Sequence, residues 1–226
     1  LHLAYSPSLE SAEILANCSL PLLMLDTTEA PSFGEDATQD MMFENHGIHG
    51  VQDLTSVLRS MGRSYSIAAG HFEDERFIDE TGLMARAAAA VSELREGTVV
   101  LIGEPFEGMG DFAVDFESLP RHLGPGVRRL PLDELAGAIE AMPEEQLETE
   151  CELDRSRYDA EGVSEKVLNT SNRVGLALRE KLRENDALGF SMNFRAFDRS
   201  VGTPTVPFLE ASKAMARGVG YAGEGD

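Results

Sequence analysis

The chain has few cysteines, few basic residues and no long apolar segment, and each shortage excludes a class of protein. The two cysteines among its 226 residues, Cys18 and Cys151, lie far apart and indicate neither a disulfide framework nor a CxxC metal site. Lysine and arginine number 19 against 40 aspartates and glutamates, and this net charge of −21 argues against nucleic acid or an anionic membrane as the main partner. No apolar run approaches the ~18–20 residues that span a bilayer.

What remains is a chain that can bury a core. Hydrophobic residues make up 42% of it, which excludes wholesale disorder, and its length suits one large or two small domains. An acidic, cysteine-poor chain of this kind is most simply cytoplasmic. No charged leader precedes an apolar segment, and the sequence stops at Asp226 without a closing helix. We therefore expect an interior fragment of a longer protein.

Short apolar runs alternate with longer amphipathic stretches, which predicts an α/β fold of parallel-sheet layers. The acidic stretch 144–161 is expected to form a solvated helical surface, and a boundary between two α/β units is expected near residues 95–105. The expected strands cover 20–25, 65–69, 98–102, 127–130 and 188–194, and the expected helices cover 8–17, 48–61, 73–94, a stretch beginning near Asp133, 163–182 and 207–217.

The first candidate site is Asn45-His46-Gly-Ile-His49-Gly50, just ahead of a predicted helix. Two histidines three residues apart can share one face of a helical turn. They could hold a metal or present two imidazoles to a bound polyol. The simpler interpretation, that one histidine caps the helix and the other is exposed, is favoured by the spacing alone, since no cysteine or third histidine lies nearby.

Further candidates follow predicted strands. The glycine-rich turn Gly103-Glu-Pro-Phe-Glu-Gly-Met-Gly-Asp111 lets a ligand approach the backbone, although its spacing matches no phosphate-binding motif. Glu224 lies between Gly223 and Gly225, and a carboxylate in such an open position suits a metal ligand or an acid/base group. Asp198 also follows a strand. Composition alone favours an ordinary turn in each case.

Taken together in this order, the motifs resemble the L-arabinose isomerase family. They are Tyr5-Ser-Pro7, Asn45-His-Gly-Ile-His49-Gly50, Ala69-Gly-His71-Phe-Glu-Asp74 and Gly220-Tyr-Ala-Gly-Glu-Gly-Asp226. The turn at 103–112 looks like the version in the L-arabinose/L-fucose isomerase-like relatives. The resemblance covers essentially the whole chain, and the final Tyr-Ala-Gly-Glu-Gly-Asp is its most specific part.

This resemblance implies a Mn²⁺-dependent aldose–ketose isomerase with flavodoxin-like α/β domains, acting on a small sugar such as L-arabinose. It also implies a homo-oligomer with active sites at subunit interfaces. Residues 1–98 would then be the latter part of the N-terminal α/β domain, residues 99–217 the central α/β domain and residues 218–226 the start of a truncated C-terminal domain. Nucleic acid and membrane are not expected partners.

The resemblance also assigns roles to single residues. Glu224 matches the metal-binding and catalytic glutamate of the GEGD motif, and His49 matches the histidine that reaches a neighbouring subunit's active site. For His46, which stands where the family commonly has glutamine, the resemblance implies a substrate contact. A second metal-ligand glutamate belongs in a TTFE-like stretch, which here reads Ser191-Met-Asn-Phe-Arg195 without a glutamate. Asp198 is the nearest carboxylate that could substitute.

These departures leave two hypotheses open. Mn²⁺ prefers several oxygen and imidazole donors, so one carboxylate does not make a site. The first hypothesis is a fragment of a sugar isomerase that moves a proton between C1 and C2 through an enediol and is inactive by itself. The second is a non-catalytic sugar-binding α/β protein that has lost the metal site.

Overall fold

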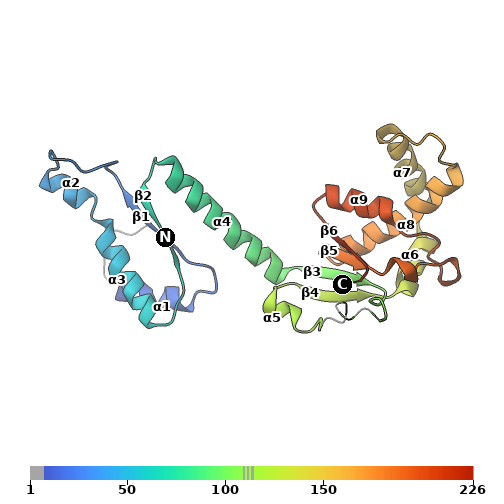
Figure 1. The fold of residues 1–226 in the computed structure, drawn as a ribbon, viewed down its shortest axis with the longest axis horizontal. Helices are drawn as coiled ribbons and strands as arrows, with labels where there is room; N and C mark the ends of the chain where they lie inside the picture. The colour runs from blue at the N-terminus through green and yellow to red at the C-terminus, as the bar shows by residue number, and fades with distance from the viewer. Residues whose placement is uncertain (1–7, 109, 111, 113–114, 226) are drawn as a thin grey trace. The chain divides into compact units, whose positions relative to one another are not determined.

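The computed structural model describes residues 8–108, 110, 112 and 115–225, so the motif residues Tyr5, Asp111 and Asp226 lie outside the described residues. The chain folds as two compact units, of which the first ends at Val91 and the second begins at Ser92. Both contain parallel strands and helices, which confirms the predicted α/β fold (Figure 1). The predicted domain limits after residues 98 and 217 stay a prediction.

The first unit is built on a two-stranded parallel sheet of β1 (Leu23–Thr28) and β2 (Ser66–His71). Helices α1 (Leu9–Asn17) and α3 (Gly47–Ser60) pack on it through a small shared core. The unit also contains α2 (Gln39–Glu44) and most of α4 (Glu75–Glu96). The side chains buried in that core are Ala12, Met24, Leu54 and Leu58.

The first strand begins three residues later than the apolar run 20–25 predicts. It extends through Thr28 because the parallel ladder pairs Leu23 with Ser66 and continues to Thr28 paired with His71. Pro21 lacks the N–H that a ladder position needs, which is consistent with the later start. Pairing with a partner more than forty residues away, rather than local hydrophobicity, sets the limits of this strand.

The second unit contains a four-stranded parallel sheet in the order β4-β3-β5-β6. Its strands are β3 (Thr98–Ile102), β4 (Gly126–Leu130), β5 (Ala187–Met192) and β6 (Gly220–Gly223). The chain goes from β3 to β4 on one side and then crosses back to β5 on the other side of β3. The carboxyl ends of β3 and β5 therefore form a topological switch point, where ligands of open α/β sheets bind.

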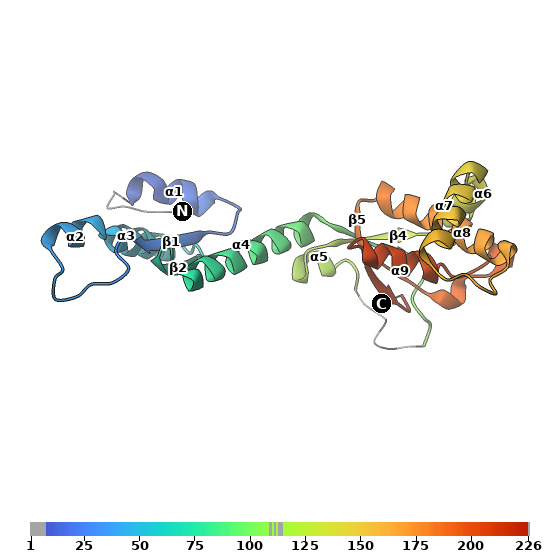
Figure 2. The same ribbon diagram turned by 90° about the horizontal axis from the view of Figure 1, so that it is seen from above.

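One face of this sheet is covered by helices α6 (Leu132–Ala141), α8 (Glu165–Glu184) and α9 (Phe208–Ala216), as Figures 1 and 2 show. Their core includes Leu135, Leu178 and Ala214 against Val100 and Phe190. The predicted cap of α8 is confirmed, since the Ser164 hydroxyl accepts the N–H of Val167. The shorter elements are α5 (Leu119–His122), η1 (Phe194–Ala196) and η2 (Arg199–Val201). Within the described residues, no helix combines the length and apolar character needed to cross a bilayer.

Helix α7 (Glu144–Arg157) corrects the expectation that the acidic stretch 144–161 is a solvated surface. Its residues Glu150 and Asp154 are buried and paired with cations of α8 and α9. Lys213 Nζ lies 2.8 Å from Glu150 Oε1 and 2.5 Å from Asp154 Oδ1, and Arg179 bridges Glu150 to Glu210. These five residues are here called the α7–α9 ion network. Their ion pairs offset the free energy needed to remove the carboxylates of α7 from water.

The α7–α9 ion network makes the stability of the chain pH-dependent. Hydrogen bonds from Arg179 and then Lys213 outweigh the effect of burial and lower the pKa of Glu150 from 4.5 to about 2. Since this folded-state pKa lies below the unfolded value, the stabilisation is complete above pH 4.5 and is lost as the pH falls toward 2.

Denaturant titrations at a series of pH values are expected to show a loss on the order of 3 kcal/mol from this group over that interval. The variant Glu150→Gln, which starts from a lower stability, should lose this component of the pH dependence. The exposed Glu148→Gln on the same helix should retain it. Equal pH profiles for the two variants would contradict the assignment.

Candidate functional site

The carboxyl edge of the four-stranded sheet brings the segments that follow its four strands to one level. Ile102 of β3 pairs with both Leu130 of β4 and Met192 of β5, and Met192 pairs with Gly223 of β6. Because the strands are parallel and in register at these ends, the next residues emerge side by side. Those residues are Gly103, Pro131, Asn193 and Glu224.

Asn193 ties the loop after β5 to the loop after β3. Its Nδ2 donates to the Glu104 carbonyl at 3.0 Å, and its Oδ1 accepts the Arg195 N–H at 3.1 Å. The Phe106 ring lies 5.3 Å from that of Phe194, and the Arg195 guanidinium lies 5.9 Å from the Phe106 centroid. An amide and an aromatic cluster thus fix the backbone of the Gly103 loop.

The turn that carries Glu224 is anchored to the same edge. The Gly225 N–H donates to the Ser191 hydroxyl at 3.1 Å. Gly225 has φ +86°, and a Cβ there would lie 3.1 Å from the Cα of Pro105. Glycine is therefore needed at this position both for its backbone conformation and for the close approach of the two loops.

Glu224 itself adopts the left-handed conformation, with φ 75°, and is exposed. This conformation is uncommon for a residue with a side chain and occurs mainly where the surroundings impose it. Burial, followed by the nearby Glu224 charge, raises the pKa of Tyr221. Glu224 therefore presents a carboxylate at the sheet edge, close enough to Tyr221 to affect its ionisation.

A cavity of about 510 Å³ opens beside these loops. Its lining joins the Gly103 loop, the start of α6 and the segment after β5. Arg129 and Glu104 form an ion pair of 2.5 Å in its wall, with both side chains largely exposed. The volume lies in the range of small-molecule sites, and the polar groups can hydrogen-bond to hydroxyl groups. The residues that line it are Gly103, Glu104, Pro105, Glu107, Arg129, Pro131, Leu132, Asn193 and Ala196.

Asp198 lies in the loop after β5, where it caps η2. Its Oδ1 accepts the Ser200 N–H at 2.8 Å, and its backbone exchanges hydrogen bonds with Thr203. Hydrogen bonds from Ser200 lower the pKa of the Asp198 carboxyl. This carboxylate has a local structural task, and its role as a metal ligand stays a prediction.

His46 and His49 lie at the start of α3, with ring centroids 3.8 Å apart. Asn45 of the same motif accepts the N–H groups of Glu29 and Ala30 at 2.6 and 2.8 Å. His71 Nε2 lies 2.8 Å from the Glu29 carbonyl. The motif residues Asn45 and His71, far apart in sequence, therefore meet at the loop after β1, beside His46. The substrate-binding roles of His46 and His49 stay predictions.

Mn²⁺ needs several donors, and the described residues do not supply them together. No group of three or more histidine, cysteine, aspartate or glutamate side chains that could hold a metal occurs within residues 8–108, 110, 112 and 115–225. The position that ends the TTFE-like stretch holds Arg195, a cation on an aromatic ring. These residues by themselves do not fit a manganese centre.

Sequence reasoning missed Asn193 and Ser191 as organising residues. Both belong to the stretch Ser191–Arg195, which stands out in the sequence only because it lacks the glutamate of the TTFE-like motif. Their position at the end of a buried strand is a usable signal, because side chains there reach the ligand edge of a parallel sheet. Their partners Glu104 and Gly225 are distant in sequence, so the contacts themselves could not be read from it.

Comparison with known proteins identifies a matching family and several relatives of the chain. The family described as L-arabinose isomerase central domain matches residues 116–226. The L-arabinose isomerase of Thermotoga maritima is 26% identical over 225 residues, covering 98% of this chain and 45% of that protein. The L-arabinose isomerase of a Nocardioides species is 28% identical over 214 residues, covering 91% of this chain and 42% of that protein.

The L-arabinose isomerase of Yersinia pseudotuberculosis is 24% identical over 213 residues, covering 91% of this chain and 42% of that protein. The chain thus spans a little under half the length of these relatives. The resemblance predicted from the motifs is confirmed. The chain is similar to the L-arabinose isomerases over nearly its whole length, and its residues 116–226 match the model of their central domain.

Proposed function

We propose that the whole protein is a sugar isomerase that interconverts an aldose and a ketose, with the carboxyl edge of the four-stranded sheet as part of its active site. The observation that carries this proposal is the placement of Glu224 level with Gly103 and Asn193, two residues that line a cavity of about 510 Å³. The named relatives support the same reaction class.

The chemistry requires a proton to move between C1 and C2 of the open-chain sugar. In the proposed reaction the Glu224 carboxylate removes the C2 proton of the aldose to form an enediol and returns a proton to C1, while a hydroxyl proton passes from O2 to O1. A pentose or deoxyhexose such as L-arabinose is the proposed substrate. His49 and His46 are proposed to contact sugar hydroxyl groups.

Manganese, oligomer formation and location belong to the same proposal. The described residues do not complete a manganese site, so Mn²⁺ binding by the whole protein would need donors in addition to Glu224 and Asp198. We infer a homo-oligomer in which active sites lie between subunits. We also infer a cytoplasmic location, on the basis of the acidic, cysteine-poor composition.

A sugar-binding protein without catalysis is the second candidate. Arg195 favours it, because a guanidinium stacked on Phe106 occupies the position where the TTFE-like stretch would carry a metal-ligand glutamate. Such a protein would keep the cavity and the loop contacts of Asn193 but would bind sugar without changing it.

Two measurements test these proposals. The 226-residue chain is expected to bind Mn²⁺ with a Kd no tighter than about 1 mM by titration calorimetry and to show no turnover of L-arabinose. Measurable turnover by this chain would contradict that expectation. The whole protein, assayed with Mn²⁺ and either L-arabinose or L-fucose, is expected to form the ketose. Saturable sugar binding without ketose formation would establish the second candidate.

A further inference from the structure

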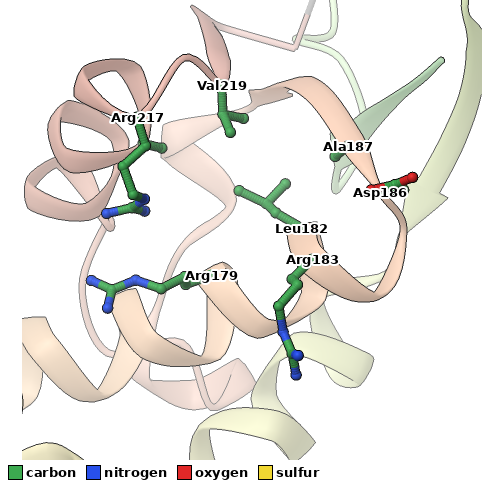
Figure 3. A pocket seen from close by; sticks show the side chains of 8 residues that line it. Arg179, Leu182, Arg183, Asp186, Ala187, Arg217 and Val219 are labelled. Atoms are coloured by element: carbon green, nitrogen blue, oxygen red, sulfur yellow. The ribbon is translucent and has the colours of Figure 1, made fainter.

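A second pocket in the same unit is lined by arginine, in a chain whose net charge is −21. It has a volume of about 350 Å³ and lies between the C-terminal half of α8 and the connection from α9 to β6. Figure 3 shows Arg179 and Arg217 on one side, with Leu182 and Val219 pointing toward the centre. The lining includes three arginines and one acidic residue, Asp186, whose carboxylate points outward in Figure 3.

The α7–α9 ion network engages only some of the N–H donors that these arginines carry. Arg179 directs four of its five N–H groups to Glu150 and Glu210. Arg217 pairs with Glu210 through a single terminal nitrogen and keeps its other N–H groups. The carboxylates of Glu150 and Glu210 are therefore already paired with arginine, while the Arg217 side chain remains substantially exposed.

Arg183 adds a third cation that the ion network does not need. It lies one helical turn after Arg179 on α8, so both residues are on the same side of the helix. Its guanidinium is exposed and pairs with no carboxylate among the residues that the structure describes. A purely structural network would be complete without Arg183.

We propose that this pocket binds a small molecule through a phosphate or carboxylate group. A guanidinium presents two parallel N–H donors that match the oxygens of either group, and exposed N–H groups beside an apolar floor are well placed to pair with an oxyanion. Leu182 and Val219, which point toward the centre in Figure 3, offer apolar contact to the rest of the ligand. The pocket is small, which restricts the ligand to metabolite size.

The test uses inorganic phosphate and succinate as probes, each titrated into the chain at constant ionic strength set with NaCl and followed by calorimetry and melting temperature. Saturable binding with a Kd at or below about 1 mM is expected for at least one probe. Arg183→Gln and Arg217→Gln are each expected to weaken it about tenfold or more. The exposed Arg128→Gln on β4 removes the same charge outside the pocket and should leave the Kd unchanged.

The outcomes separate the proposal from its rivals. The preferred probe tells whether phosphate or carboxylate is recognised. Arg183 is exposed and its guanidinium pairs with no carboxylate among the described residues, so Arg183→Gln should keep the fold and decides the test even if Arg217→Gln unfolds. No saturation by either probe, or equal affinity in Arg183→Gln and the unmodified chain, would overturn the proposal. Neither probe is a sugar, so the result is independent of the isomerase activity.

Discussion

Replacing Lys213 by methionine is expected to lower the free energy of unfolding by roughly 3–5 kcal/mol, because it leaves Asp154 as a buried carboxylate without a cation. Asp154 is 3% exposed, and Lys213 Nζ lies 2.5 Å from its Oδ1. Its other oxygen, Oδ2, is buried and has no hydrogen-bond partner among the described residues. Methionine keeps the length of the side chain but removes the charge.

Urea unfolding followed by circular dichroism measures this loss. The exposed Lys166→Met on α8 is the matched control and should change stability by less than about 0.5 kcal/mol. The double variant Lys213→Met/Asp154→Leu removes both charges and is expected to recover most of the lost stability, since Glu150 keeps its hydrogen bonds to Arg179. A single variant as stable as the Lys166 control would show that the ion pair contributes little.

Replacing Glu224 by glutamine in the whole protein is expected to reduce kcat/KM for ketose formation by about 10²–10⁴-fold. Glutamine has the same shape but cannot accept the C2 proton. Because Glu224 is exposed and its backbone is held through Gly225 and Ser191, the fold should be unchanged. The rate of ketose formation and the binding of sugar are measured separately.

The controls for this experiment distinguish chemistry from folding. Glu117→Gln, an exposed change near the same sheet, should retain full activity. Asp198→Asn tests the second carboxylate. A loss of kcat/KM as large as that of Glu224→Gln would support a metal-ligand role for Asp198, and a small loss would support its role in capping Ser200. Full activity in Glu224→Gln would rule out this carboxylate as the base.

The sequence anticipated features that depend on short-range patterns. The buried strand Thr98–Ile102, the helix after Ser164 and the parallel α/β alternation are all observed. Each of these features depends on hydrophobic periodicity or on a capping residue within three positions, so interactions between near neighbours in the sequence determine it. The motif order likewise predicted the resemblance to the L-arabinose isomerases, which the comparisons confirm.

The arrangement of the candidate site depended on contacts that no local pattern encodes. Asn193 and Gly225 organise the sheet edge through Glu104 and Ser191, which lie 89 and 34 residues away in sequence. Glu224 could be named from its motif, but its position at the same level of the sheet edge as Asn193 and Gly103 follows from the strand register. Register is set by pairing across the sheet, which only the folded chain possesses.

By itself, the sequence determined the alternation of helices and strands, the acidic character and the similarity to the L-arabinose isomerases. Tertiary structure alone decided the strand order β4-β3-β5-β6, the limits of β1 and the burial of Glu150 and Asp154. An acidic helix is ordinarily solvated, because a lone buried carboxylate is costly. Here Arg179 and Lys213, contributed by helices later in the chain, neutralise that cost, and only folding brings them together.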